Sequence, residues 1–264
     1  MSGLVPFEAK LLLAHVMNRD RAWLTAHADA PLTREQALAY DALARRRRNG
    51  EPVAYLTGRR EFFGLELEIT PDVLIPRPET ELLVELALTW LSNDASARVL
   101  DLGCGSGAVA LAIAHERPRA RIVGADVAPA AVALARRNAD RLAIGNATFI
   151  ESDWFHRVPR ESFALIVANP PYVAQEDSHL QQGDLRFEPV SALASGGDGL
   201  DAIRAIVAAA SDYLPGGSML ALEHGHDQAN AVQRLLCDAG FGDVTSARDL
   251  AGIPRVTYGR RSPG

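Results

Sequence analysis

The segment DLGCGSGAVALAIA, residues 101–114, has the spacing of a site for a nucleoside-containing cofactor. Its glycines, Gly103, Gly105 and Gly107, follow a strand-like run and precede a helix-like one. The backbone can therefore turn tightly there, and a ligand can approach without meeting a Cβ. Asp126 ends the next apolar run, at about the 20-residue offset where a carboxylate binds ribose hydroxyls. A tight turn beside an ordinary surface aspartate is the alternative interpretation.

Two carboxylates and an aromatic ring favour S-adenosyl-L-methionine as that cofactor. Asp101 precedes the first glycine, where its charge would attract the cationic methionine end of the cofactor and repel a pyrophosphate. Asp153 and Trp154 follow the third predicted strand, and an acceptor beside a flat ring suits the adenine amino group and its base. Two alternatives stay open. Gly103-x-Gly105-x-x-Ala108 also satisfies the dinucleotide pattern, and SDWF can be a capping Asp with a packed Trp.

The segment VANPPYV, residues 167–173, turns an apolar run directly into Asn-Pro-Pro-Tyr. One proline already ends a strand, because it lacks an N–H and fixes φ. The second proline, Pro171, and its polar and aromatic neighbours indicate a further task. The Asn169 side-chain oxygen and the Pro170 carbonyl are two acceptors that can receive both N–H groups of an –NH₂ and direct its lone pair at a methyl donor. Tyr172 would pack against the planar substrate. A rigid loop without catalysis is the alternative.

The elements that must position these residues form an α/β pattern after residue 92. Predicted strands are residues 98–102, 121–126, 148–152, 163–168 and 218–223, and helix-like segments between them include 108–116, 129–142 and 200–214. Apolar strands between helices are typical of a parallel sheet covered on both faces. Ligands collect at the carboxyl ends of such strands, where Asp101, Asp126, Asp153 and Asn169 are expected. Residues 242–261 predict a β-hairpin at the sheet edge.

The first 75 residues have a different pattern. Residues 7–48 are helix-like, and Thr33 with Gln36 has the form of a capping box. Residues 54–70 predict a hairpin with its turn at or near Gly58, and a helix is expected from Glu79. We therefore predict a small helical substrate-docking domain with a linking hairpin over residues 1–75, and a Rossmann-like domain over residues 76–264.

Composition sets bounds on these predictions. The 264 residues are 48% hydrophobic and 23% charged, which is typical of a globular protein with a sizeable core. The net charge of −6 argues against a general nucleic-acid binder. Cys104 and Cys237 lie far apart, the start lacks a signal-peptide pattern, and no apolar run has membrane-spanning length. We therefore expect a cytoplasmic protein with no membrane partner.

Several segments together resemble the PrmC/HemK family, the peptide chain release factor N5-glutamine methyltransferases. The likeness runs from residue 8 onward and is carried by YLTGRREFFGLELEITPDVLIPRPETELLVE, DLGCGSGAVALAIA, VANPPYV, FEPVSALASGGDGLDAIRAI, LEHG and DLAGIPRV. NPPY after the fourth strand is similar to class I methyltransferases that modify planar –NH₂ groups. The resemblance implies methylation of the glutamine in the Gly-Gly-Gln motif of release factors, with S-adenosyl-L-methionine as methyl donor.

The resemblance also implies roles for individual residues. The segment 103–107 (with Cys104 and Ser106 where the family often has threonines), Asp126, Trp154 and Asn169 would bind the cofactor. Residues 169–172 would hold the glutamine, while Phe62 of EFFG, with Arg77 and Glu79 of IPRPETE, would line the substrate side. The segment 45–48 is interpreted as a solvated, basic helix end. No metal site is predicted, because Glu223, His224 and His226 in LEHGH lack further clustered ligands.

We therefore expect a release factor glutamine methyltransferase of Rossmann-like fold, with no direct nucleic-acid substrate. The alternatives are a nucleic-acid N-methyltransferase, acting on adenine N6 or guanine N2, and a non-catalytic cofactor-binding module. The first is disfavoured by the acidic balance and by the lack of a basic, aromatic-rich segment. The second would need a damaged acceptor site, whereas NPPY is intact.

Overall fold

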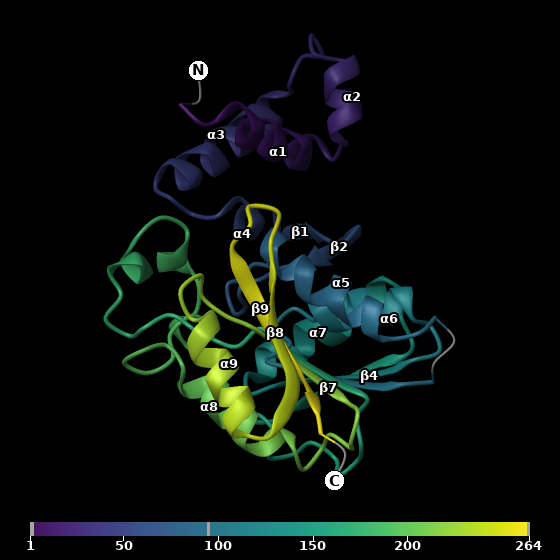
Figure 1. Cartoon of the computed structure of the whole chain (residues 1–264). Helices are drawn as coiled ribbons and strands as arrows, with labels where there is room; N and C mark the ends of the chain where they lie inside the picture. Colours follow the sequence, from purple (N-terminus) through teal and green to yellow (C-terminus); the bar gives the residue numbers. More distant parts are fainter. Residues whose placement is uncertain (1–2, 94–95, 263–264) are drawn as a thin grey trace.

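The N-terminal lobe is a group of helices that stands apart from the rest of the chain (Figure 1). The structure is a computed structural model and describes residues 3–93 and 96–262. The lobe comprises α1 (Pro6–Met17), α2 (Arg21–Ala26) and α3 (Arg34–Arg48). The predicted capping box begins α3, since Gln36 N donates to Thr33 Oγ1 at 3.1 Å and Thr33 N donates to Gln36 Oε1 at 2.9 Å. Leu12 and Ala44 are buried between these helices and α4.

A short helix and a hairpin link the lobe to the sheet. Helix α4 (Val53–Thr57) ends at Gly58, whose φ of 68° closes the helix. Strands β1 (Arg59–Phe62) and β2 (Leu65–Glu68) then pair antiparallel. The predicted turn at Gly58 is wrong: the chain reverses at Phe63 and Gly64, and Gly58 is a helix cap. The apolar residues 54–56 (AYL), predicted as strand, form a helical turn instead, because α1 and α3 cover one side of this segment.

The hairpin belongs to the core of the large domain. Phe62, Leu65, Leu67 and Ile69 are buried in one cluster with residues of the helices that cover the sheet. The buried Asn138 reinforces this contact, because its Oδ1 accepts from Glu68 N at 2.7 Å and its Nδ2 donates to Glu68 O at 3.0 Å. The boundary at residue 75 stays a prediction, but among the described residues the buried cluster of the hairpin includes none from α1, α2 or α3.

A twisted seven-stranded sheet forms the centre of the large domain, in the order β5-β4-β3-β6-β7-β9-β8. Strands β3 to β7 are parallel, while β8 and β9 add the predicted antiparallel hairpin at one edge. The strands are β3 (Arg98–Leu102), β4 (Arg121–Asp126), β5 (Ala147–Glu151), β6 (Leu165–Ala168), β7 (Met219–Glu223), β8 (Phe241–Arg248) and β9 (Pro254–Arg261). The five predicted parallel strands are thus confirmed, with ends shifted by two residues at most.

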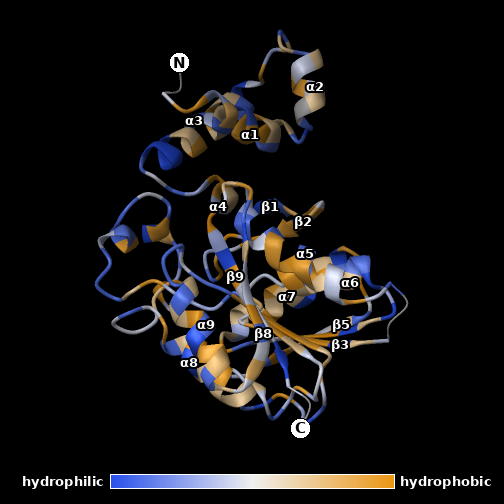
Figure 2. Ribbon diagram, in the orientation of Figure 1, coloured by the Kyte–Doolittle hydropathy of each residue, from blue (hydrophilic) through white to orange (hydrophobic). Residues whose placement is uncertain are grey.

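Helices cover both faces of the sheet, and the strands are correspondingly apolar (Figure 2). Val99 faces the cluster that contains α5 (Glu81–Trp90), α6 (Ala108–Glu116) and α7 (Pro129–Arg141). Leu100 and Leu102 face the cluster that contains α8 (Asp201–Ala210) and α9 (Ala229–Asp238). The α5 helix is preceded by a 3₁₀ turn, η1 (Pro78–Thr80), so the helix expected at Glu79 begins two residues later. The predicted α/β class with a Rossmann-like sheet is confirmed.

The long loop after β6 contains three short 3₁₀ turns, η2 (Ser178–Gln181), η3 (Leu185–Phe187) and η4 (Val190–Ala192). It is tied to two distant segments. Arg77 pairs with the buried Glu188, and Arg47 at the end of α3 donates to Asp184 at 2.8 Å and to Glu8 at 2.8 Å. Arg47 is therefore a bridge between the lobe and this loop, which departs from the predicted solvated helix end. Among the described residues, no helix is long and apolar enough to cross a membrane.

Candidate active site

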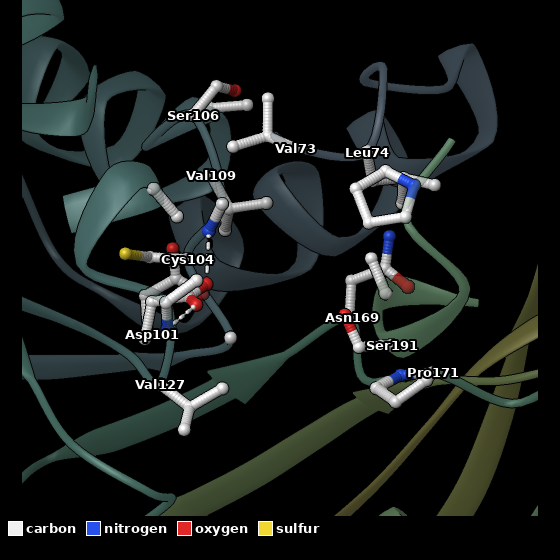
Figure 3. A pocket seen from close by; sticks show the side chains of 18 of the residues that line it. Val73, Leu74, Asp101, Cys104, Ser106, Val109, Val127, Asn169, Pro171 and Ser191 are labelled. Carbon is white, nitrogen blue, oxygen red and sulfur yellow. Dashed lines mark hydrogen bonds between the residues drawn. The ribbon is translucent and has the colours of Figure 1, made fainter. Parts of the chain in front are cut away.

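The candidate site is a cavity at the carboxyl ends of the parallel strands. The chain leaves β3 and β6 in opposite directions there, which is the switch point where open α/β sheets bind ligands. Asp101 on β3 and Asn169 after β6 lie on opposite sides of the cavity in Figure 3. Ten of the residues predicted from sequence line it: Asp101, Gly103, Cys104, Gly105, Ser106, Asp126, Asp153, Trp154, Asn169 and Pro171.

The glycine-rich turn between β3 and α6 forms the floor of the cavity. Gly103 has φ 73°, and a Cβ at this position would lie 3.7 Å from the Trp154 ring and 3.9 Å from the Asn169 carbonyl oxygen. Gly107 has φ 84° and begins α6 next to Phe149, without lining the cavity. The two glycines therefore have separate tasks: Gly103 provides the left-handed backbone of the turn at the cavity, where a Cβ would make only ordinary contacts, and Gly107 lets the helix pack on the sheet.

Asp101 and Asp126 are two of the acidic residues that line the cavity. The side chain of Asp101 is buried and accepts from Ala110 N at 3.0 Å. Burial raises the pKa of Asp101 to about 7, and the nearby Asp126 adds to the increase. Asp126 accepts from Gly105 N at 2.9 Å and from Ala128 N at 2.9 Å, and burial raises its pKa as well. Asp126 thus holds the glycine turn, and its oxygens lie at the cavity wall.

Trp154 contributes an aromatic wall after β5. Its backbone has φ 42°, a left-handed conformation that is costly for a non-glycine residue. Ser152 stabilises this turn, because its hydroxyl donates to Trp154 O at 2.8 Å and accepts from Arg157 N at 2.9 Å. The turn places both Asp153 and Trp154 at the cavity. Cys104 is buried and its surroundings raise the pKa of its thiol, so it stays an uncharged part of the floor.

Asn169 lines the cavity and has an unpaired acceptor. Its Nδ2 donates to Thr80 Oγ1 at 3.1 Å, whereas its Oδ1 is buried and has no hydrogen-bond partner within the protein. An unmatched buried acceptor costs about 1–3 kcal/mol, so an incoming N–H donor gains by meeting it. Pro171 lines the cavity beside it, while Tyr172 points away and donates its hydroxyl to Glu223 at 3.3 Å. Pro170 and Tyr172 are thus outside the cavity wall in this structure.

The three residues assigned to the substrate side by resemblance are also outside the wall. Phe62 is 1% exposed in the hairpin core, Arg77 pairs with Glu188, and Glu79 is exposed on η1. Arg77 acts through Glu188. Burial raises the pKa of the Glu188 carboxyl, and the guanidinium of Arg77 opposes that increase. Glu188 also accepts from Ile75 N at 3.2 Å. This pair holds two chain segments together beside the cavity.

The sequence did not predict that these two segments form part of the cavity wall. Residues 72–74, Pro76 and Thr80 form one part of the wall, and Pro189, Ser191 and Ala192 form another. The prolines in IPRPETE and FEP were the available signal, since a proline fixes the backbone of a wall without needing a partner for an N–H. His224, in contrast, is structural: it is buried and bonded to Thr257 Oγ1 at 2.8 Å. No cluster of side chains suited to a metal ion occurs in the described ranges.

A sheet of this order, with a glycine turn, an acidic residue after the second strand and NPPY after the fourth, defines a class I methyltransferase. A crystal structure of a methyltransferase from Pyrococcus furiosus has the same fold, with a TM-score of 0.58 and 18% identity over 83% of this chain and 97% of that one. The "Methyltransferase small domain" profile matches residues 79–198, and the "PrmC N-terminal domain" profile matches residues 3–58.

Full-length relatives are more specific. The chain is 53% identical to release factor glutamine methyltransferase of Burkholderia pseudomallei, over 98% of this chain and 93% of the relative. It is 48% identical to the protein of that name in Escherichia coli, over 96% of this chain and 91% of the relative. The chain therefore belongs to the family of release factor glutamine methyltransferases. The predicted resemblance and the S-adenosylmethionine-dependent class are both confirmed.

Proposed function

We propose that this protein transfers a methyl group from S-adenosyl-L-methionine to the side-chain amide nitrogen of the glutamine in the Gly-Gly-Gln motif of peptide chain release factors. The observation that carries the proposal is the unpaired Oδ1 of Asn169, a buried acceptor beside a cofactor-type cavity. A primary amide has two N–H groups and a delocalised lone pair. It needs acceptors that hold it in one orientation, and the turn from residue 169 to residue 172 offers them.

The residues present fit S-adenosyl-L-methionine. Asp126 stands at the end of β4 for the ribose hydroxyls, and Asp153 with Trp154 stands after β5 for adenine. Asp101 is buried at the end of β3, where a cationic ammonium group would compensate its charge. When bound, the cofactor supplies an electrophilic methyl group on a sulfonium, and its transfer leaves S-adenosylhomocysteine as the second product.

Positioning is the protein's contribution to the rate. Asn169 Oδ1 would accept one substrate N–H, and the Pro170 carbonyl, which does not line the cavity in this structure, would have to turn toward it to accept the other. The nitrogen lone pair would then be directed toward the cofactor end of the cavity. The two prolines limit movement of these acceptors, since both φ angles are fixed. No catalytic base is required, because methyl transfer first gives a cationic, N-protonated amide, which is a strong acid and releases its extra proton to water.

Selection of one glutamine requires contacts outside the cavity. A single side-chain amide offers too few atoms to distinguish one protein from all others. We assign this role to the N-terminal lobe, where the apolar side chains of Val5, Phe7 and Leu38 are exposed. A partner held by the lobe raises the local concentration of its glutamine at the cavity.

The test is a labelling experiment with three acceptors. The protein is incubated with methyl-labelled S-adenosyl-L-methionine and a release factor, the same factor with its Gly-Gly-Gln glutamine replaced by alanine, or DNA. We expect label in the intact factor only, with a mass gain of one methyl group on the glutamine-containing peptide. Label in DNA, or equal label in the alanine variant, would refute the proposal.

A further inference from the structure

Gln228 is a half-buried glutamine in the turn between β7 and α9, and it does not line the cavity. Its side chain hydrogen-bonds to the backbone of three separate segments. The Nε2 group donates to Tyr172 O at 3.0 Å and to Asp198 O at 3.2 Å. The Oε1 atom accepts from Gly225 N at 2.8 Å. One side chain therefore connects the turn after β7 to two points of the chain that lie 30 and 56 residues away in sequence.

The backbone groups around this side chain require a primary amide. Two carbonyl oxygens need donors, and one backbone N–H needs an acceptor. A primary amide supplies two N–H groups and an oxygen, whereas a carboxylate has no donor and an apolar side chain has neither. The amide of Gln228 can thus satisfy all three groups in one orientation only. Its hydrogen-bonding pattern, and not its volume, accounts for a glutamine at this position.

Two of these contacts lie at the two ends of one loop. Tyr172 is the last residue of the acceptor turn, which we define as residues 169–172. Asp198 lies where the long loop after that turn comes back to the sheet, just before α8. Residues 189–192 of the same loop contribute to the cavity wall. By donating to both carbonyls, Gln228 closes the base of the loop next to the acceptor turn.

Gly199 shows how closely the chain segments approach at this junction. Its φ is 77°, and a Cβ there would lie 2.2 Å from Tyr172 O and 2.7 Å from Gln228 Nε2. A side chain cannot occupy that space unless the acceptor turn or the glutamine moves. The backbone of Gly199 therefore packs directly against the hydrogen bond between Gln228 and Tyr172.

The acceptor turn is held at both of its ends. At the first end, Asn169 Nδ2 donates to Thr80 Oγ1 at 3.1 Å. At the other end, Gln228 holds the carbonyl of Tyr172. The two residues between these ends are prolines, whose φ angles are fixed. A displacement at Tyr172 is therefore transmitted toward Asn169, because the rigid turn has few torsions that could absorb it.

We propose that Gln228 is a positioning residue for methyl transfer, whose side-chain amide fixes the far end of the acceptor turn and thereby the place of the Asn169 amide. This inference rests on the proposed function, which gives the acceptor turn its role. Gln228 lies outside the cavity wall, and no bond forms or breaks at it. Its effect is on turnover, while the cofactor residues at the ends of β3, β4 and β5 keep their positions.

The first test replaces the amide and keeps the approximate length of the side chain. Gln228→Met removes the hydrogen bonds, and Gln228→Glu directs carboxylate oxygens at the two carbonyls, which repel them. We expect Gln228→Met to lower kcat about 10–100-fold and Gln228→Glu to lower it further, because a displacement of about 1 Å can cost about 10²-fold in rate. The KM for cofactor and the KM for the release factor should each stay within about threefold.

Gln233→Met is the matched control. Gln233 is also half-buried, lies on α9 and donates from Nε2 to Ser246 Oγ at 2.9 Å, away from the acceptor turn. This variant loses a comparable hydrogen bond and should retain the wild-type kcat.

A double variant distinguishes positioning from a loss of structure. If Gln228 acts through Asn169, adding Gln228→Met to Asn169→Ala changes the single-turnover rate by less than about threefold, because the group being positioned is already absent. A general loss of structure would multiply the two effects. Gly199→Ala disturbs the same junction from the opposite side, and it should lower kcat with the KM for cofactor unchanged.

Two results would overturn the proposal: folded Gln228→Met and Gln228→Glu proteins that both turn over like wild type, or multiplicative losses in the double variant. If the Gln228 variants fail to fold, Gly199→Ala takes their place in both comparisons, alone and combined with Asn169→Ala. A wild-type protein that labels no release factor would refute the proposed function instead, so the two failures are distinct.

Discussion

The amide of Asn169 uses only part of its hydrogen-bonding capacity within the protein. The donor side is satisfied by Thr80, and the acceptor side is left for a ligand. The unpaired amide oxygen lowers the stability of the free protein, and binding of an N–H donor restores that stability. At the scale of single residues, the site is therefore prepared for a substrate that donates hydrogen bonds, which a glutamine amide does.

Asn169→Ala removes that acceptor, and we expect the protein to fold and to turn over about 10²–10³-fold more slowly. Single-turnover methylation of a release factor, with cofactor affinity measured by calorimetry on the same preparation, is the relevant experiment. Because Asn169 also lies near the cofactor, the affinity measurement is needed to separate binding from chemistry. Methylation at nearly the wild-type rate would remove Asn169 from the mechanism.

We expect Asp101 to make cofactor binding depend on pH. Because its pKa is raised to about 7 in the free protein, it is partly protonated at neutral pH, whereas a bound cation favours the charged form. We therefore expect S-adenosyl-L-methionine to bind more tightly as the pH rises from about 6 to about 8, with proton release. Calorimetry in buffers of different ionisation enthalpy measures the released proton, and Asp101→Asn should abolish it.

The raised pKa of Asp101 has the opposite effect on the stability of the fold, which falls rather than rises with increasing pH. A buried acid with a raised pKa stabilises the fold while it is protonated, and this contribution is lost as the pH rises through the folded-state value. Without ligand, stability should fall between about pH 4 and pH 7, and it should fall less in Asp101→Asn, as judged by urea unfolding. An unchanged slope in that variant would mean that Asp101 is not the responsible group.

At the scale of elements, strand ends were the predictable part of the site. Alternation of apolar runs with helical segments locates the carboxyl ends of β3, β4, β5 and β6, and the residues placed there line the cavity. The prolines signal rigid backbone in residues 72–76 and 189–192, but not that the two segments meet at the cavity, because that depends on a contact between Arg77 and Glu188 across 111 residues of sequence. Gly58 was misplaced for a related reason, since local pattern does not show which helices cover a short apolar run.

The hairpin gives a prediction about where the large domain begins. Its buried Phe62, Leu65, Leu67 and Ile69 each contribute about 1.5–3 kcal/mol. Together they approach the whole stability of a typical domain, ~5–15 kcal/mol. A fragment of residues 51–264 should fold and bind cofactor, whereas residues 76–264 should not. Thermal unfolding and cofactor calorimetry on both fragments provide the check, and cooperative unfolding of the shorter one would contradict it.

At the scale of the whole molecule, the lobe and the catalytic domain are connected through few groups. Arg47 bridges Glu8 and Asp184, and Arg186 donates to the Asn49 carbonyl. Asp184 and Arg186 belong to the loop that continues to Glu188 and the cavity wall. A partner that binds the lobe is therefore held next to the segment that shapes the entrance to the site.

Surface changes on the lobe should affect partner binding alone. Val5→Ser with Leu38→Ser replaces two exposed apolar side chains, which are 61% and 60% exposed. We expect the KM for an intact release factor to rise at least about tenfold, since each 1.4 kcal/mol of lost contact is a factor of ten. The affinity for cofactor should not change. A short glutamine peptide should be methylated equally by both proteins, and an unchanged KM for the intact factor would exclude this face.

The anchoring of the lobe also has a consequence for modular exchange. Because the described residues of the buried cluster around the hairpin all lie at or after Ala54, we expect that recombination could replace the chain N-terminal to Gly50 without opening that core. A transplanted lobe would still need a cationic side chain that pairs with Asp184 and a backbone carbonyl that accepts a hydrogen bond from Arg186. Exchange of about 50 residues could therefore change which protein is methylated, while residues 169–172 and their chemistry stay the same.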